Sequence, residues 1–367
     1  MLTPPTASPK HTPSDASAGP SLAERYRELS LAEPRLRQRE AAERLGCSEG
    51  ALVACQLGTP QCTRLDERWL DLLRDLEAAG PLMALTRNEH AVIEKTGHYR
   101  NVTPEAGGAM GQVLGDGIDL RLFLRSWGAG FALAAPTPHG PRQSLRFYTR
   151  GGEAIHEIFE TDATDRAAFA EVIARYHHAE QTSPFDAAGA IGADEPPAPE
   201  RPDAEVDRAQ LLAGWEALTD THQFFGLLRR VGATRTQALR LGAPRWAERV
   251  RLGSWRTLLE RAAADRLKLM VFVGSRGVME IHTGPIAQVK AVGDWYNILD
   301  PGFNLHLFEP GVSEAWVVRK PAEGIVVSSL ELYDRAGGVV ALFFVKRKEG
   351  EPAPEAWTVL LDQLERA

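Results

Sequence analysis

The chain has 367 residues, of which 44% are hydrophobic, and a formal net charge of −7. This length predicts two or more domains with sizeable cores, and no apolar run approaches the ~20 residues that a membrane helix needs. The acidic balance argues against a protein whose main task is to hold nucleic acid. The three cysteines (Cys47, Cys55 and Cys62) are odd in number and lack C-x-x-C spacing, which argues against a disulfide framework or a zinc site and fits a reducing compartment.

The N-terminal residues 1–20 are rich in Pro, Ser, Thr and Ala without an apolar core, so they predict a disordered tail rather than a signal peptide. Apolar residues then recur at helical spacing over 21–79, and Gly80-Pro81 ends the last helix. Within this region the tract Gln38–Leu52 resembles a helix-turn-helix with Gly46 at the turn. Glu49 and apolar residues follow that turn instead of base-reading side chains, so a structural helical hairpin is favoured over DNA reading.

From residue 83 to 159 short β-rich runs alternate with Gly, Pro and Asp turns, and a helix is predicted over 165–178. An acidic, Pro-containing segment over 181–207 predicts a mobile linker between two units. The order then repeats, with helices over 208–266, strands over 268–346 and a closing helix over 354–364.

The two halves also match residue by residue. Residues 82–97 align with 269–284 at an offset of 187, and Ser144–Tyr148 aligns with Ser329–Tyr333 at an offset of 185. The predicted fold class is therefore α+β, with two structural repeats packed as a pseudo-symmetric pair, each made of helices followed by an antiparallel sheet. The predicted organisation is a tail (1–20), a first repeat (21–180), a linker (181–207) and a second repeat (208–367).

His222 is the histidine with the most informative surroundings. Asp220, followed by Gln223, predicts a capping box that places His222 in the first turn of a helix, where the helix dipole favours a neutral imidazole. Phe224 and Phe225 supply an apolar wall, and Arg229 and Arg235 follow. A neutral histidine, an apolar wall and nearby guanidinium groups are what a haem site requires. A histidine next to a pair of phenylalanines nevertheless more often caps a helix or packs against its neighbours than binds a ligand.

The chain resembles the HemS/HmuS family of bacterial haem-handling proteins, also called haemin-degrading factors, from about Ser21 to the C-terminus. The stretches that carry the resemblance occur in order over both repeats: Met83-Ala-Leu-Thr-Arg-Asn-Glu, Glu94-Lys-Thr-Gly-His-Tyr-Arg-Asn, Asp119-Leu-Arg-Leu-Phe, Thr219-Asp-Thr-His-Gln-Phe-Phe, Thr234-Arg-Thr-Gln-Ala-Leu-Arg, Ile281-His-Thr-Gly-Pro, Trp295-Tyr-Asn-Ile-Leu-Asp-Pro-Gly-Phe-Asn-Leu-His-Leu and Trp316-Val-Val-Arg-Lys-Pro.

The resemblance implies a haem b ligand in a cleft beneath the second half, with His222 as the axial iron ligand. Arg121 would face the other side of the iron as the distal, catalytic residue, with Arg125 as the alternative. Three cations would hold the propionates, namely Arg235, Lys320 and Arg347. This chain departs from the family pattern at Leu342-Phe343-Phe344, where polar and tyrosyl side chains are expected, so Phe344 would pack on the ring.

His306 occupies the repeat-equivalent place of Arg121, and it is interpreted as a sheet residue, with a second, looser haem on that half as the alternative. The resemblance implies a cytoplasmic protein that receives imported haem and either degrades it, using an external electron donor, or delivers it onward. The partners implied are an inner-membrane haem importer and a haem oxygenase. A helix-turn-helix DNA-binding regulator and a non-catalytic repeat scaffold remain the alternatives.

Overall fold

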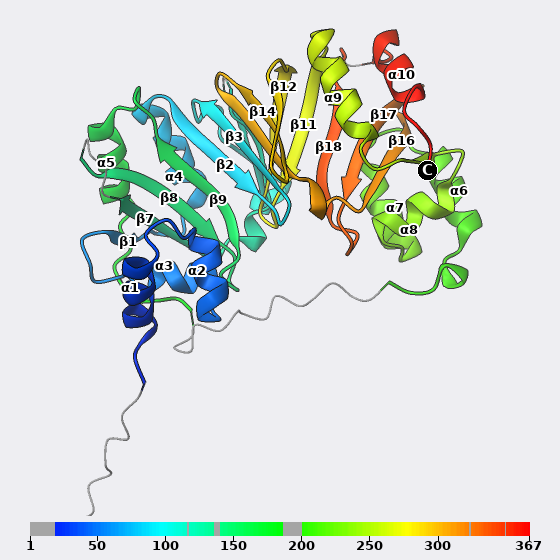
Figure 1. Ribbon diagram of the computed structural model, residues 1–367. Coiled ribbons are helices and arrows are strands. Elements are labelled where there is room, and N and C mark those ends of the chain that lie inside the picture. Colours follow the sequence, from blue (N-terminus) through cyan, green and yellow to red (C-terminus); the bar gives the residue numbers. More distant parts are fainter. Residues whose placement is uncertain (1–18, 116, 136–139, 186–199, 323, 349) are drawn as a thin grey trace, which may run out of the picture.

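The computed structural model describes residues 19–115, 117–135, 140–185, 200–322, 324–348 and 350–367 (Figure 1). Most of the predicted tail and the central part of the predicted linker, 186–199, lie outside the described residues. The described end of the linker packs on the protein instead of running free: Arg240 pairs with Glu200 at 2.5 Å and with Asp203 at 2.9 Å. Residues 200–207 therefore belong structurally to the second repeat.

The first repeat contains helices at both ends of a run of strands. Its helices and strands are α1 (Leu22–Ala32), α2 (Gln38–Leu45), α3 (Glu49–Ala54), β1 (Cys62–Arg64), α4 (Trp69–Asp75), β2 (Leu82–Arg87), β3 (Ala91–Gly97), β4 (Thr103–Glu105), β5 (Met110–Leu114), β6 (Asp119–Leu122), β7 (Ala129–Ala135), β8 (Arg142–Tyr148), β9 (Ala154–Glu160) and α5 (Arg166–Arg175).

The second repeat follows the same order. Its elements are α6 (Arg208–Glu216), α7 (Gln223–Val231), α8 (Arg235–Gly242), β10 (Ala247–Val250), α9 (Ser254–Ala264), β11 (Lys268–Gly274), β12 (Val278–Pro285), β13 (Val289–Val292), β14 (Trp295–Asp300), β15 (Phe303–Phe308), β16 (Glu314–Ala322), β17 (Ile325–Tyr333), β18 (Val339–Val345) and α10 (Glu355–Asp362). The predicted α+β class with two repeats and antiparallel sheets is confirmed.

The two repeats exchange strands, which the sequence did not predict. The first nine-stranded sheet has the order β1-β7-β8-β9-β2-β3-β15-β14-β13, and the second has the order β10-β16-β17-β18-β11-β12-β6-β5-β4. We call these the N-terminal and the C-terminal sheet. Each therefore ends in three strands that belong to the other repeat, and Arg121 on β6 lies in the C-terminal sheet, where it pairs with Met279 on β12.

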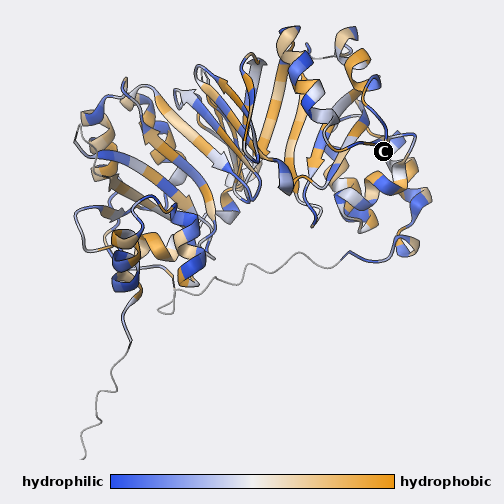
Figure 2. Cartoon of the chain, viewed as in Figure 1, coloured by the Kyte–Doolittle hydropathy of each residue, from blue (hydrophilic) through white to orange (hydrophobic). Residues whose placement is uncertain are grey.

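Each sheet is covered by helices on both sides. On one side α4 and α5 pack on the N-terminal sheet, and α9 and α10 pack on the C-terminal sheet over Leu269, Val271 and Val273. On the opposite side the hairpins α1–α3 and α6–α8 cover only one end of each sheet (Figure 1). Hydrophobic residues gather on the strands, with alternating burial along β2 and β15 as expected for strands with one buried face (Figure 2).

Candidate functional site

His222 lies immediately before α7, which begins at Gln223, so the predicted placement in the first helical turn is wrong by one residue. Asp220 is not the N-cap of that helix either. Its Oδ1 accepts hydrogen bonds from the backbone N of His222 at 2.8 Å and from the ring Nδ1 at 2.7 Å. The aspartate forms a local turn with the residue two positions on, which competes with helix capping for the same carboxylate.

The Asp220 contact fixes how the His222 ring presents its nitrogens. Because a carboxylate can only accept, Nδ1 carries the proton, and in the neutral ring Nε2 keeps its lone pair. The His222 side chain is 92% exposed, so this nitrogen is accessible. The hydrogen bonds from the His222 backbone and ring lower the pKa of Asp220. A carboxylate behind an imidazole is the arrangement that orients histidine ligands of metals.

The C-terminal sheet has an apolar face that is partly exposed. Pairing of β11 with β18 places Met270 opposite Phe344, and pairing with β12 places Gly274 opposite Met279, so these side chains share one face of the C-terminal sheet. Phe272 lies on the same face, and its ring packs edge-on against Phe344 with centroids 5.3 Å apart. Met270, Phe272, Met279 and Phe344 are all partly exposed, and we call these four residues the open face.

Arg121 lies at the far margin of the open face. It is paired with Met279, and its Nη1 donates to the Asp119 carboxylate and to the Leu120 carbonyl oxygen at 3.2 Å. Three strand spacings separate β18 from β6, so Arg121 lies about 14 Å across the sheet from Phe344. Arg125, the alternative distal residue, is exposed and lies beyond the end of β6.

Arg347 follows the end of β18, two residues beyond the last strand position. Its Nη1 donates to the carbonyl oxygens of Lys348 at 3.3 Å and Glu351 at 3.4 Å. Phe344 points to the open face, whereas its neighbour Phe343 is fully buried in the core beneath α9. Phe344 therefore gives the open face an aromatic ring without a hydroxyl group.

The structure brings Arg235 and Lys320 together around Glu331, a residue that the sequence prediction missed. Glu331 on β17 is fully buried; its carboxylate accepts from Nε and Nη2 of Arg235 at 2.8–3.0 Å and from Nζ of Lys320 at 2.8 Å. Ser329 and Tyr333 also donate to it. A comparison of the repeats could have identified Glu331. Residues 329–333 of the second repeat read Ser-Leu-Glu-Leu-Tyr, whereas residues 144–148 of the first repeat read Ser-Leu-Arg-Phe-Tyr.

The electrostatics of this cluster follow from its burial. Although burial opposes it, the charges of Arg235 and Lys320 hold the pKa of Glu331 far below its ordinary value. Burial lowers the pKa of Lys320 to about 8, against the opposing effect of Glu331. Arg235 and Lys320 lie over the ring of Phe224, at 5.6 and 5.0 Å from its centroid, which connects the cluster to the start of α7.

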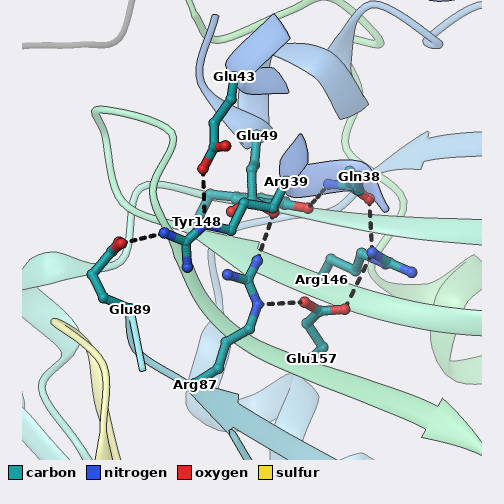
Figure 3. Close-up of polar contacts among 9 residues, drawn as sticks. All are labelled: Gln38, Arg39, Glu43, Glu49, Arg87, Glu89, Arg146, Tyr148 and Glu157. Atoms are coloured by element: carbon teal, nitrogen blue, oxygen red, sulfur yellow. Dashed lines mark hydrogen bonds and ion pairs between the residues drawn. The ribbon is translucent and has the colours of Figure 1, made fainter. Parts of the chain in front are cut away.

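The corresponding face of the N-terminal sheet is charged instead of apolar (Figure 3). Arg87 pairs with Glu49 at 2.5 Å and with Glu157 at 3.5 Å, and Arg146 pairs with Glu157 at 3.2 Å. Gln38 continues this chain of contacts from Arg146 to the hydroxyl of Tyr148. The residues beside it line a hollow of about 470 Å³.

His306 lies on the same sheet, opposite Val92 of β3. Its Nδ1 is 2.7 Å from Oδ1 of Asn297, and burial lowers its pKa, with Glu94 opposing the shift and Arg37 adding to it. A histidine held by a strand neighbour agrees with the interpretation as a sheet residue.

The helix-turn-helix-like tract forms a packed hairpin. α2 ends at Gly46 in the left-handed conformation, and Ser48 caps α3 by accepting from the backbone N of Ala51. Residues 50–54 of α3 are all buried, so this helix has no exposed face with which to contact bases. Within the described residues, no cluster of three or more His, Cys, Asp or Glu side chains is arranged to hold a metal ion.

The model of the "Haemin-degrading HemS.ChuX domain" family matches the chain twice, over residues 46–176 and 232–364. The chain belongs to the HemS family. Two HemS-family relatives are the hemin transport proteins HmuS of Yersinia pestis, 35% identical over 92% of this chain and 95% of the relative, and HemS of Yersinia enterocolitica, 36% identical over the same shares.

Two solved structures of HemS-like proteins share the architecture. Holo-PhuS, a heme-binding protein from Pseudomonas aeruginosa, superposes with a TM-score of 0.90 at 42% identity, covering 97% of this chain and 100% of that one. ChuS, an E. coli heme oxygenase, superposes with a TM-score of 0.82 at 34% identity, covering 94% and 99%.

Proposed function

We propose that the protein binds one haem against the open face of the C-terminal sheet, with His222 as the axial ligand, and either passes it on or opens its ring. Two observations carry the proposal, namely the Asp220–His222 pair, which leaves an accessible Nε2, and the partly exposed aromatic and thioether surface of the C-terminal sheet. Such a surface desolvates a porphyrin, and the accessible Nε2 supplies the nitrogen that iron takes. Relatives named for haemin transport and haem binding support the same ligand.

The other residues take roles according to their place around the open face. Arg121 is the distal residue in this proposal, which is supported by its pairing with Met279 at the edge of the open face. Phe344 packs on the ring. Arg235, Lys320 and Arg347 lie toward the propionate side; Nε and Nη2 of Arg235 are held by Glu331. The haem supplies the redox chemistry, and these residues bind and orient it.

Transport and degradation remain two outcomes of the same site. An inner-membrane haem importer and a haem oxygenase are the proposed donor and acceptor, and the cytoplasm is the proposed compartment. Among the described residues, no helix is both long and apolar enough to span a bilayer. The high exposure of His222 supports hand-over, because an accessible ligand is one that an acceptor histidine can replace.

The first experiment is a Soret-band titration of the apo protein and of His222→Ala with haemin. We expect a saturable 1:1 shift in the wild type that is weakened or altered in the variant. Identical curves for the two proteins would refute His222 as the ligand. Ascorbate added to the complex in the presence of catalase then separates the two activities: loss of the Soret band with release of carbon monoxide or a related product marks an enzyme, and an unchanged band marks a carrier.

A further inference from the structure

One buried contact joins equivalent residues of the two repeats. Lys95 on β3 and His282 on β12 correspond at the offset of 187, and Nζ of Lys95 donates to Nδ1 of His282 at 3.1 Å. A residue meets its own equivalent only where a two-fold axis passes, so this contact marks the pseudo-two-fold axis that relates the repeats. Pairing of a repeat with its own copy would put two lysines, or two histidines, at this point.

On one side of this axis the buried contacts are polar. Glu280 of β12 is fully buried, and its Oε2 lies 4.0 Å from Nδ1 of His156 on β9. The two ring nitrogens of His156 are each 2.8 Å from a hydroxyl oxygen, Nδ1 from that of Thr86 and Nε2 from that of Tyr99. We call Thr86, Tyr99 and His156 the polar cluster. The carboxyl group of the second repeat therefore lies against polar side chains of the first repeat.

The equivalent contacts on the other side of the axis are apolar. The offset of 187 puts Ile93 in the place of Glu280. The offsets of 187 and 185 replace the polar cluster by three apolar residues, which are Val273, Ile286 and Ala341. The strand registers support this alignment, because the two offsets map the pairing of β2 with β9 onto that of β11 with β18. All three residues are buried in the same hydrophobic core as Ile93, and we call them the apolar cluster.

We propose that Lys95, Glu280 and the polar cluster make each repeat pair with the other repeat of the chain in preference to a copy of itself. Two first repeats would bring Lys95 against its own copy, and like charges in a buried contact repel. Two second repeats would put both Glu280 carboxyl groups against apolar clusters, where they lose their polar neighbours. Only the pairing of unlike repeats avoids both costs. The inference does not involve the haem site.

An exchange that conserves composition tests the Glu280 contact in the full-length chain. Ile93→Glu/Glu280→Ile moves the carboxyl group from the polar to the apolar cluster, as in a pair of second repeats. We expect its unfolding equilibrium constant, from urea denaturation at pH 7 followed by circular dichroism, to rise roughly 10- to 100-fold above that of wild type. Ile93→Met/Glu280→Ile makes a similar change of shape without the carboxyl group and should not be destabilised in this way.

A second exchange tests the Lys95 contact. His282→Lys puts two lysines at the axis and should raise the unfolding constant by a similar factor. Lys95→His/His282→Lys restores one lysine and one histidine and should recover most of that loss. The inference is overturned if Ile93→Glu/Glu280→Ile is as stable as wild type, or if Lys95→His recovers nothing. Where a destabilised variant does not fold at all, a folded Ile93→Met/Glu280→Ile or Lys95→His/His282→Lys supports the inference, and an unfolded one contradicts it.

A further measurement follows the pairing itself. Lys95→His/Glu280→Ile removes both costs of self-pairing. After refolding from urea at high protein concentration, this full-length variant should contain a larger fraction of dimer than wild type treated in the same way. Light scattering coupled to size-exclusion chromatography measures the two fractions, and equal values would contradict the inference.

Discussion

At the level of single residues, the orientation of the His222 ring depends on its hydrogen-bond partner Asp220 more than on the helix that follows it. The sequence indicated a capping aspartate, but the structure gives the Asp220 carboxylate to the imidazole at 2.7 Å. A carboxylate behind a ligating histidine fixes its ring orientation and raises its basicity, and loss of such a partner typically weakens metal binding by 10- to 100-fold.

Asp220→Asn should therefore weaken haemin binding by roughly 10-fold, because the amide keeps the turn but loses the charge behind the ring. The measurement is the haemin Kd from the Soret titration. Asp334→Asn is the matched control: Asp334 accepts from the backbone N of Ala336 and Gly338 in a similar turn, with no histidine beside it. Equal affinities for wild type and Asp220→Asn would contradict the assigned role.

Arg121 provides the second prediction at this scale. If its guanidinium faces the distal side of the iron, Arg121→Leu should lower the affinity of the ferric complex for azide by roughly 10-fold, since one charge-assisted hydrogen bond is lost. The 1:1 haemin stoichiometry should stay unchanged. Arg125→Leu, which lies beyond the end of β6, should behave as wild type, and the opposite ranking of the two variants would reassign the distal residue.

At the level of elements, the exchange of strands joins the two repeats. β15 pairs with β3 in one sheet, and β6 pairs with β12 in the other. Because β15 is the repeat equivalent of β6, and β12 that of β3, the two junctions are versions of one interface. Each repeat therefore contains both strand types of this interface, β3 and β6 in the first repeat and β12 and β15 in the second. A repeat could for this reason pair with a second copy of itself.

We expect the isolated second repeat, residues 200–367, to form a dimer in which β15 of each copy pairs with β12 of the other. An unpaired β12 edge would otherwise expose a row of backbone donors and acceptors. Light scattering coupled to size-exclusion chromatography measures the mass. Leu305→Pro, in the middle of β15, removes a strand N–H and should abolish the dimer; a stable monomer of the unmodified half would refute the prediction.

At the level of the whole molecule, ionisable side chains are buried where the two sheets meet. Glu280 on β12 is fully buried, and its Oε2 lies 4.0 Å from Nδ1 of His156 on β9 of the other sheet. Burial raises the pKa of Glu280 to about 8, although the Thr86 hydroxyl and the Lys95 charge oppose the shift. Burial lowers the pKa of His156 to about 3.

The raised pKa of Glu280 sets the sign of a pH dependence. Between the ordinary value of 4.5 and about 8 the folded protein holds a proton that the unfolded chain has lost, so this residue makes the fold less stable as pH rises. Glu280→Gln should remove that loss, and the stability difference between the variant and wild type should shift in favour of the variant by on the order of 4 kcal/mol from pH 5 to pH 9.

Urea denaturation at three pH values measures the difference. Glu43→Gln, whose carboxylate is 63% exposed, serves as the control and should show no such trend. A stability difference between Glu280→Gln and wild type that stays constant over this pH range would show that the carboxyl group does not titrate in the fold.

The sequence by itself determined the α+β class, the two repeats and the histidine to test, because periodicity and self-similarity are local properties of the chain. It also showed Arg121 as a distal candidate, but only through the family resemblance. Tertiary structure decided the rest: strand exchange brings β6 into the sheet of the other repeat, and Glu331 gathers Arg235 and Lys320 around one carboxylate. These contacts join residues far apart in the chain, so no local sequence pattern reveals them.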